Sequence, residues 1–464
     1  MADTWTGDAV GLVEAFRRGE RSPTEELAAT YEAIDASELN AVCFTDREQA
    51  MAAARSADTS LPFGGVPIGV KELNSVEGWP DTAASVALAD RVADHTATMI
   101  QRLQAAGAVL AAQTTSSEFG GVNQTNTKLH GATRNPWNVD RTPGGSSGGS
   151  AAGVAGGLFP IATGGDGGGS IRIPSGFCGL IGLKSTWGRI PRGPHIGPGN
   201  LTAVPGCQSR SVRDTARWFD VTNGFDARDP LSLPRVDGWE AGLGGHLDDL
   251  ANSSAAVIPA FGDAVVADET ISMVVEAAGW LIDRLGMTRR DVEAGLPRTG
   301  GAWGATGGVF LLKTLGDRWP DCAPDLTGAM RVGVERTVEY YGAEVAIRAE
   351  EARIALNEAM ADLFTEVDFV FAATNPDIAF GADGHLPTEF GGKPARAINN
   401  GALTIPSNIY GNPAISIPIG TDSSGLPVGL QVLAAHHREP ELLDVALAFE
   451  RERPWPLVAP SVTV

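Results

Sequence analysis

Basic residues are scarce in this chain of 464 residues. Its 35 lysines and arginines face 56 aspartates and glutamates, which leaves a formal net charge of −21, and no basic run of five or more residues is present. A surface of this charge repels polyphosphates, so we expect neither nucleic acid nor a membrane as a partner. With 43% apolar and 20% charged residues, the composition excludes a disordered chain and predicts a soluble globular protein.

Long apolar runs and paired cysteines are missing too. No stretch approaches the ~20 apolar residues of a membrane helix, and the start, MADTWTGDAV, has neither the basic nor the apolar region of a secretory signal. The four cysteines, Cys43, Cys178, Cys207 and Cys322, form no CxxC pair, which is typical of reduced thiols. We therefore expect a cytoplasmic protein.

Motifs for the common cofactors are also absent. The glycine-rich run 164–170 lacks the lysine of a phosphate-binding P-loop, and no GxGxxG opens a unit with an acidic residue about twenty positions on. The seven histidines show neither HExxH nor a zinc-type spacing with cysteine. We expect no metal, nucleotide or other cofactor.

Short apolar runs alternate with helical patterns along the chain. Residues 64–72, GGVPIGVKE, predict a buried strand that carries a charged residue, Lys71, at its end. This alternation predicts an α/β fold with helices on both faces of a sheet. The first sixty residues are predicted to be helices, at 7–18 and 22–35 (from a capping box), and the other predicted elements are helices at 95–106 and 343–366, a helix after Ser211, and strands at 109–111 and 369–371.

Glycine is in excess, with 58 residues. Twelve of them fall between Gly144 and Gly169, in a stretch that also holds Leu158, Phe159 and Ile161. These apolar residues would be wasted on a solvated linker, so the stretch is predicted to belong to the core.

Residues 144–148, GGSSG, fit the GxSxG pattern of a nucleophile elbow centred on Ser146. Such an elbow follows an apolar strand, whereas residues 138–143 do not resemble a buried strand. An α/β-hydrolase esterase stays an alternative, and it would require His436 or His437 as the base.

Three separated blocks carry more information together. They are Lys71 after its apolar strand, PGGSSGGSAA at 143–152, and GGDGGGSIRIPSGFCGLIGLKS at 164–185. In their order, and in the interval between Ser146 and Ser170, the chain resembles the amidase signature family, most strongly over 63–225 and again at 408–432. GATRNPWN at 131–138 is similar to bacterial stand-alone amidases.

The resemblance implies the amidase signature fold, a large twisted mixed β-sheet with α-helices on both faces. It implies a single domain over residues 1–464, with the signature core at about 63–225. A region of more variable composition, about 226–345, is expected to shape the substrate site. Aromatic residues there, such as Trp303, fit either an acyl pocket or the core.

The resemblance also implies a catalytic triad of Lys71, Ser146 and Ser170. Ser170 is the expected nucleophile, and Ser146, preceded by a cis peptide bond from Gly145, relays its proton to Lys71. Lys71 acts as a base only when neutral, and burial lowers a lysine pKa from its ordinary value near ~10.4.

Further site residues follow from the same resemblance. Backbone N–H groups of the glycine-rich loop are expected to form an oxyanion hole, and an ion pair between Asp166 and Arg172 is expected to fix its shape. Small residues near position 120 are expected to line the acyl pocket and leave room for a bulky group. The oxyanion residues are Gly167, Gly168, Gly169 and Ser170, and the pocket residues are Gly120, Gly121 and Val122.

The predicted function is hydrolysis of a linear carboxylic amide or anilide to acid and amine or ammonia. A second candidate is the glutamine-hydrolysing subunit of a tRNA amidotransferase, although residues 186–207 lack the SSLDQIGP-like run typical of it. Glu72 and Gly167 depart from the usual family residues, but neither removes a reacting group. The expected partner is a small-molecule amide, and the oligomeric state stays open, with a homodimer among the options.

Overall fold

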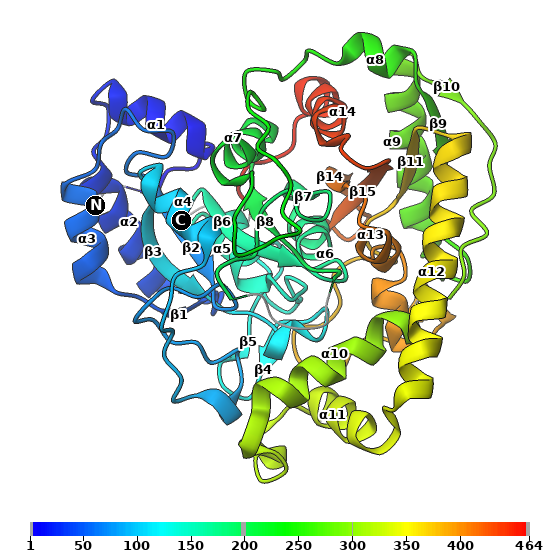
Figure 1. Ribbon diagram of the computed structural model, residues 1–464. Helices are drawn as coiled ribbons and strands as arrows, with labels where there is room; N and C mark the ends of the chain where they lie inside the picture. The colour runs from blue at the N-terminus through cyan, green and yellow to red at the C-terminus, as the bar shows by residue number, and fades with distance from the viewer. Residues whose placement is uncertain (1–2, 196–200, 299, 461–464) are drawn as a thin grey trace.

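Two β-sheets form the centre of the molecule, and helices lie around them (Figure 1). The structure, a computed structural model, describes residues 3–195, 201–298 and 300–460. Within these residues the first sheet has the order β1 (Val42–Phe44), β3 (Val109–Thr114), β2 (Pro67–Lys71), β6 (Ile161–Asp166) and β8 (Val204–Ser209). The second has the order β10 (Thr288–Arg289), β9 (Ser254–Val257), β11 (Phe369–Ala373), β15 (Pro427–Ala434), β14 (Ala414–Thr421) and β7 (Gly182–Lys184).

Both sheets contain parallel and antiparallel pairs. In the first, β2 runs parallel to β3 and β6, whereas β8 runs antiparallel to β6. The sheets meet where the N–H of Ile181, just before β7, donates to the carbonyl of Ser209 at 3.0 Å. The predicted α/β fold with mixed β-sheet is therefore confirmed, although the strands are divided between two sheets.

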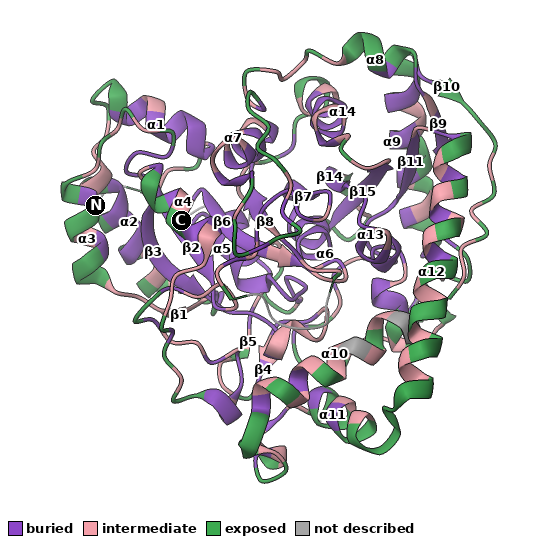
Figure 2. Cartoon of the chain, viewed as in Figure 1, coloured by how far each residue is buried: buried purple, intermediate pink, exposed green. Residues whose placement is uncertain are grey.

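Helices make up most of the outer shell, and Figure 2 shows the buried faces turned toward the strands. Over residues 3–195, 201–298 and 300–460, no helix combines the length and apolar character needed to span a bilayer. The helices are α1 (Ala9–Arg17), α2 (Pro23–Ala36), α3 (Arg47–Arg55), α4 (Thr98–Ala105), α5 (Gly148–Ala155), α6 (Arg172–Cys178), α7 (Val212–Thr222), α8 (Leu247–Ala251), α9 (Asp268–Leu285), α10 (Gly300–Leu315), α11 (Gly328–Tyr340), α12 (Ala343–Glu366), α13 (Ile405–Tyr410) and α14 (Glu439–Glu452). Two short hairpins, β4 (Asn126–Thr127) with β5 (Gly131–Ala132) and β12 (Glu389–Phe390) with β13 (Lys393–Pro394), complete the list.

Local signals in the sequence place several helix ends. The Ser22 hydroxyl accepts the N–H of Glu25 at 3.2 Å, and the Glu25 carboxylate accepts the N–H of Ser22 at 2.8 Å, which confirms the predicted capping box of α2. Ser211 caps α7 in the same way, by accepting the N–H of Asp214 at 3.2 Å. The prediction of helices alone in the first sixty residues was wrong, because β1 is a short edge strand paired with β3.

The glycine-rich stretch is core, as predicted. It forms α5 and β6, and the ring of Phe159 between them lies against two glycines. A Cβ on Gly153 of α5 would come within 2.3 Å of that ring, and one on Gly69 of β2 within 2.6 Å. Bare backbone at these two positions lets α5 approach the strand that ends at Lys71.

The region predicted to shape the substrate site has two parts. Strand β9 and helix α9 belong to the second sheet and its cover, where Val274 and Leu281 are fully buried. Helix α10 packs against both α11 and α12 at one end of the molecule, with much exposed surface (Figure 2). Trp303 of α10, in this second part, lines the cavity of the candidate site described below.

We predict opposite effects for two glycine-to-alanine substitutions in helices. Gly153→Ala should lower the free energy of unfolding by ~1–3 kcal/mol, because the added methyl meets a buried ring that has no room to move. Gly279→Ala in α9 should raise it by ~0.5–1 kcal/mol, since its Cβ meets nothing within 4 Å and alanine favours helix. Urea unfolding followed by circular dichroism measures both, and equal effects would contradict this packing.

Candidate active site

Lys71 lies at the carboxyl end of β2, inside the protein. Only 2% of its surface is exposed. Its Nζ lies 2.7 Å from the Oγ of Ser146 and 2.9 Å from the Oγ of Ser147. Its backbone N–H donates to the hydroxyl of Thr163 in β6 at 2.8 Å, which fixes the strand end. The structure thus brings together two of the three predicted triad residues.

The electrostatic setting of Lys71 favours the neutral amine. Burial lowers the pKa of Lys71 to about 7, while the carboxylates of Asp166 and Glu72 oppose this shift. Removing an ammonium from water disfavours the charged form, and no carboxylate forms an ion pair with this amine within the described residues. A large share of Lys71 is therefore neutral near pH 7.

Lys184 is a second buried lysine, and it shows that a lowered pKa alone does not identify a catalytic base. Burial, followed by the charge of Arg172, lowers the pKa of Lys184 to about 7 as well. Its Nζ donates to the carbonyl of Ser185 at 3.0 Å, and no hydroxyl accepts from it in the described part of the chain. Contact with serine hydroxyls is what distinguishes Lys71 as a candidate base.

Ser146 lies just before α5 and is 3% exposed. The peptide bond between Gly145 and Ser146 is cis, as the family resemblance implied. Gly145 is closely surrounded, because a Cβ there would come within 2.4 Å of the Ser117 hydroxyl. The tight surroundings of this loop hold the Ser146 hydroxyl against Lys71.

Ser170 follows the glycine loop between β6 and α6 and is partly exposed. It borders a cavity of about 150 Å³. Among the described residues its hydroxyl has no hydrogen-bond partner, so the predicted contact between Ser146 and Ser170 is not formed. Catalytic hydrogen bonds in unliganded enzymes are often long and tighten only when substrate binds. The residues that line this cavity are Gly120, Gly121, Val122, Asn123, Gly168, Ser170, Trp303, Leu386, Ala397, Ile398, Gly401 and Ile405.

Two side chains from distant segments hold the carbonyls of the glycine loop. The Nε1–H of Trp303 donates to the carbonyl of Gly167 at 2.6 Å, and the Thr404 hydroxyl donates to that of Gly168 at 2.8 Å. In a trans peptide the next N–H points away from the carbonyl, so the first contact directs the N–H of Gly168 to the opposite side of the loop.

The four residues predicted to form the oxyanion hole differ in whether their N–H groups already have a hydrogen-bond partner. The N–H of Gly169 donates to the carboxylate of Asp166 at 2.7 Å, so this donor is already engaged. Within the described residues the N–H groups of Gly167, Gly168 and Ser170 have no partner. Gly169 instead serves the turn, since its φ is +119° and a Cβ would come within 2.4 Å of the Thr404 hydroxyl.

Asp166 and Arg172 form the expected ion pair, and both side chains are fully buried. Nε and an Nη of Arg172 each lie 3.0 Å from an oxygen of Asp166. Asn408, Gln431 and the Thr404 carbonyl bind the remaining polar atoms of the pair. Burial alone would raise the pKa of Asp166, but the Arg172 charge and its hydrogen bonds hold that pKa well below its usual range.

The sequence prediction missed the residues that reach this site from the last third of the chain. Thr404 and Asn408 lie in and beside α13, and Gln431 in β15. Single polar residues inside apolar runs were the available signal, since each is buried. The predicted pocket residues Gly120, Gly121 and Val122 do line the cavity at Ser170.

The base that an esterase would need is not at the site. The ring of His436 donates from Nε2 to the Tyr410 carbonyl at 2.9 Å, and His437 lies beside an arginine. Neither histidine forms a hydrogen bond with Ser146 or Ser170 within the described ranges. The geometry therefore does not support the α/β-hydrolase alternative.

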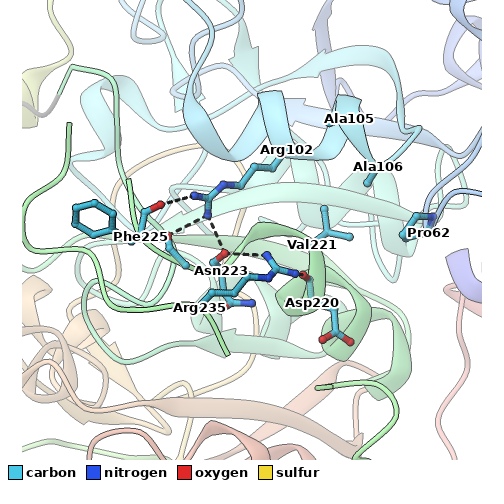
Figure 3. A pocket seen from close by; sticks show the side chains of 10 residues that line it. Pro62, Arg102, Ala105, Ala106, Asp220, Val221, Asn223, Phe225 and Arg235 are labelled. Atoms are coloured by element: carbon cyan, nitrogen blue, oxygen red, sulfur yellow. Dashed lines mark hydrogen bonds between the residues drawn. The ribbon is translucent and has the colours of Figure 1, made fainter. Parts of the chain in front are cut away.

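A larger hollow of about 670 Å³ lies near the ends of α4 and α7 (Figure 3). Its two arginines point toward backbone carbonyls rather than into open space. Arg102 donates to the carbonyls of Asn223 at 2.8 Å and Phe225 at 2.9 Å, and Arg235 to that of Asn223 at 3.3 Å. The ten described residues that line it include no serine, cysteine or lysine, and the Asp220 carboxylate accepts three backbone N–H groups.

Comparison with known proteins relates the whole chain to amide-cleaving enzymes. The sequence profile described as Amidase matches residues 24–299 and 323–443. A glutamyl-tRNA(Gln) amidotransferase subunit from Trichormus variabilis is 31% identical over 487 aligned positions, covering 97% of this chain and 99% of its own.

Solved structures agree with this relationship. A bacterial aryl acylamidase of the amidase signature family superposes with a TM-score of 0.89 at 27% identity, covering 97% of both chains. A 6-aminohexanoate cyclic dimer hydrolase superposes with a TM-score of 0.87 at 29% identity over the full length of both.

We predict that removing one partner of the buried ion pair strongly destabilises the fold. Asp166→Asn should lower the free energy of unfolding by ~3–5 kcal/mol, because it leaves the Arg172 charge buried without its carboxylate. The matched control is Glu344→Gln in the exposed pair with Arg348, which should change stability by less than ~0.5 kcal/mol. Denaturant unfolding measures both, and a loss below ~1 kcal/mol for Asp166→Asn would contradict this assignment.

Proposed function

The chain belongs to the amidase signature family of amide-cleaving enzymes, and we propose that it hydrolyses linear carboxylic amides or anilides through an acyl-enzyme on Ser170. The observation that carries the proposal is the contact of the buried Lys71 amine with the Ser146 hydroxyl at 2.7 Å. A neutral amine beside a serine, next to a second serine on a glycine loop, supplies a base, a relay and a nucleophile.

The first half-reaction forms the acyl-enzyme. Ser146 gives its proton to the neutral Nζ of Lys71 and takes the proton of Ser170, whose Oγ attacks the amide carbonyl carbon. The C–N bond then breaks, and the proton returns from the Lys71 ammonium through Ser146 to the leaving nitrogen. The products are an ester on Ser170 and a neutral amine.

The second half-reaction releases the acid. A water molecule gives a proton through Ser146 to Lys71 as its oxygen attacks the ester carbonyl. Collapse of the tetrahedral intermediate breaks the bond to Ser170, and Ser170 regains the proton along the same route. Lys71 ends neutral, so one turnover consumes one water.

Negative charge develops on the carbonyl oxygen in both steps. We assign its stabilisation to the N–H groups of Gly167, Gly168 and Ser170, and not to Gly169, whose N–H is bound to Asp166. Each such donor is worth about 3–4 kcal/mol where measured in other enzymes. The contacts that Trp303 and Thr404 make with the loop carbonyls support this assignment, because they fix the peptide planes before substrate arrives.

The cavity beside Ser170 favours an uncharged acyl group. The described residues that line it include no charged side chain, and most are glycine or apolar. A free amino acid would have to bury an ammonium and a carboxylate there without ionic partners, which is costly. We therefore propose a compact apolar or aryl acyl group as the preferred substrate part.

Glutamine hydrolysis for a tRNA amidotransferase is the second candidate, because the relative from Trichormus variabilis carries that name. The uncharged lining opposes it, since glutamine carries both charges. Residues 196–200 of the stretch that lacks the expected run lie outside the described residues. Comparing aryl, aliphatic and glutamine amides separates the two functions, and a preference for glutamine would favour the second.

We expect Ser170→Ala to lose amide hydrolysis by ~10⁴–10⁶-fold, as when the nucleophile of a triad is removed. Mass spectrometry of the wild-type protein quenched with an aryl amide should find the acyl group on Ser170. Ser147→Ala is the control: it removes one hydrogen bond to Lys71, worth ~0.5–1.5 kcal/mol, so the loss should be about tenfold or less. Activity retained in Ser170→Ala would refute the assignment.

Hydrolysis should depend on pH through Lys71. Its pKa in the folded protein is lowered to about 7, so the neutral base is scarce at acid pH and increases as pH rises through this value. The rate should therefore rise from about pH 5 and level off above about pH 8. A profile that is flat over this range, with circular dichroism unchanged, would exclude lysine as the base.

Lys184 titrates in the same range and needs its own control. Lys184→Met removes this amine without touching Lys71 or its two serines. The midpoint of the rate profile should stay where it is in the wild-type protein. Loss of the midpoint in Lys184→Met would show that Lys184, and not Lys71, produces the titration.

A further inference from the structure

Three side chains of different chemistry lie close together, and one of them is Glu72, the residue that follows Lys71. The Sγ of Cys43, a carboxylate oxygen of Glu72 and a ring nitrogen of His130 all lie within 4.8 Å of one another. They come from β1, from the end of β2 and from the turn between β4 and β5. We propose that these residues form a binding site for a zinc-like divalent transition-metal ion.

The distances between the three ligand atoms are close to what such an ion requires. In a tetrahedral zinc site, bonds of ~2.0–2.3 Å separate the ligand atoms by roughly 3.3–3.8 Å. The Nε2 of His130 and Oε2 of Glu72 are 2.9 Å apart, and no pair among the three atoms exceeds 4.8 Å. The Oε1 of Gln113 also lies 3.8 Å from the Cys43 sulfur.

The environment holds the ligands in place before any ion binds. The N–H of Ser116 donates to Oε1 of Glu72 at 2.7 Å, so this oxygen is fixed and Oε2 faces the cluster. Glu72 is 1% exposed, whereas 19% of the His130 side chain is exposed and gives an ion a route from solvent. Hydrogen bonds of this kind to a ligating carboxylate orient it and raise affinity.

The donor set selects the class of ion. Calcium and magnesium require six or more oxygen ligands, and this cluster offers a sulfur, a nitrogen and a carboxylate. Thiolate and imidazole together favour zinc, cobalt or copper. Binding forms a metal–sulfur bond and releases the thiol proton to solvent, so the thiolate and carboxylate together balance a divalent charge.

The sequence alone predicts no metal, because the three ligands lie far apart along the chain. Glu72 and His130 are 58 positions apart and belong to different strands and turns. Zinc motifs in sequences depend on ligands a few positions apart on one element. A cluster assembled by sheet topology leaves no such spacing.

A bound ion would tie β1 and the β4–β5 turn to the residue next to the catalytic lysine. Within the described residues another group of possible ligands, Asp94, His95 and His195, also lies within 4.8 Å. It is more exposed and has no sulfur, so a sulfur-dependent signal separates the two groups.

Cobalt absorption tests the proposal on the full-length protein. The protein is freed of metal with EDTA, the chelator is removed, and cobalt(II) is added. We expect one equivalent to give a thiolate-to-cobalt charge-transfer band in the near ultraviolet. Zinc should abolish the band, because nitrogen and sulfur sites bind zinc more tightly than cobalt.

Two variants and two controls locate the site. Cys43→Ala should lose the band, and His130→Gln should weaken cobalt binding at least tenfold, while Cys322→Ala and His95→Gln should behave as the wild type. Absence of the band in the wild-type protein at millimolar cobalt, or a band that persists in Cys43→Ala, would overturn the proposal.

A second measurement guards against variants that fail to fold. Zinc should raise the melting temperature of the wild-type protein in proportion to the logarithm of its concentration, because it binds only the folded cluster. His95→Gln should show the same increase. No increase in the wild type would contradict the site, and the pH profile proposed above is measured with EDTA present so that the two tests stay independent.

Discussion

The site depends on keeping one amine inside the protein without a carboxylate partner. A buried lysine paired with an acid stays charged and cannot accept a proton, whereas one in contact with hydroxyl groups alone loses its proton near neutral pH. Two carboxylates that could pair with Lys71 are instead bound to other groups. Asp166 is taken up by Arg172, and Glu72 by Ser116 and His130. The ion pair beneath the glycine loop therefore protects the neutral state of Lys71 as well as holding the loop.

The excess of glycine follows from the same construction. Gly153 and Gly69 admit a phenyl ring between α5 and the strand that carries Lys71, and Gly169 adopts a backbone angle closed to other residues beside Thr404. At each of these glycines, neighbouring atoms lie closer to the backbone than a Cβ would allow. The glycines of this stretch thus serve packing at some positions, while the N–H groups of Gly167 and Gly168 have no partner among the described residues.

Much of this could be predicted from the sequence, and the failures have physical reasons. The strand ending at Lys71, the capped helix after Ser22 and the pairing of Asp166 with Arg172 are set by local patterns or by motifs in one segment. Thr404 and Trp303 could not be predicted as partners of the glycine loop, because their contacts depend on how distant segments fold together. Cys43 and His130 were missed for the same reason. The hydrogen bond that engages the N–H of Gly169 with Asp166 is also encoded by no motif.

The contacts around the glycine loop also bear on how the protein is made. Asp166 and Arg172 emerge from the ribosome early, yet Thr404, Asn408 and Gln431, which satisfy their polar atoms, are synthesised near the end. Until those residues are synthesised, the pair lacks the hydrogen bonds that they supply. Completion of this polar network therefore requires segments that lie 232 or more positions later in the chain.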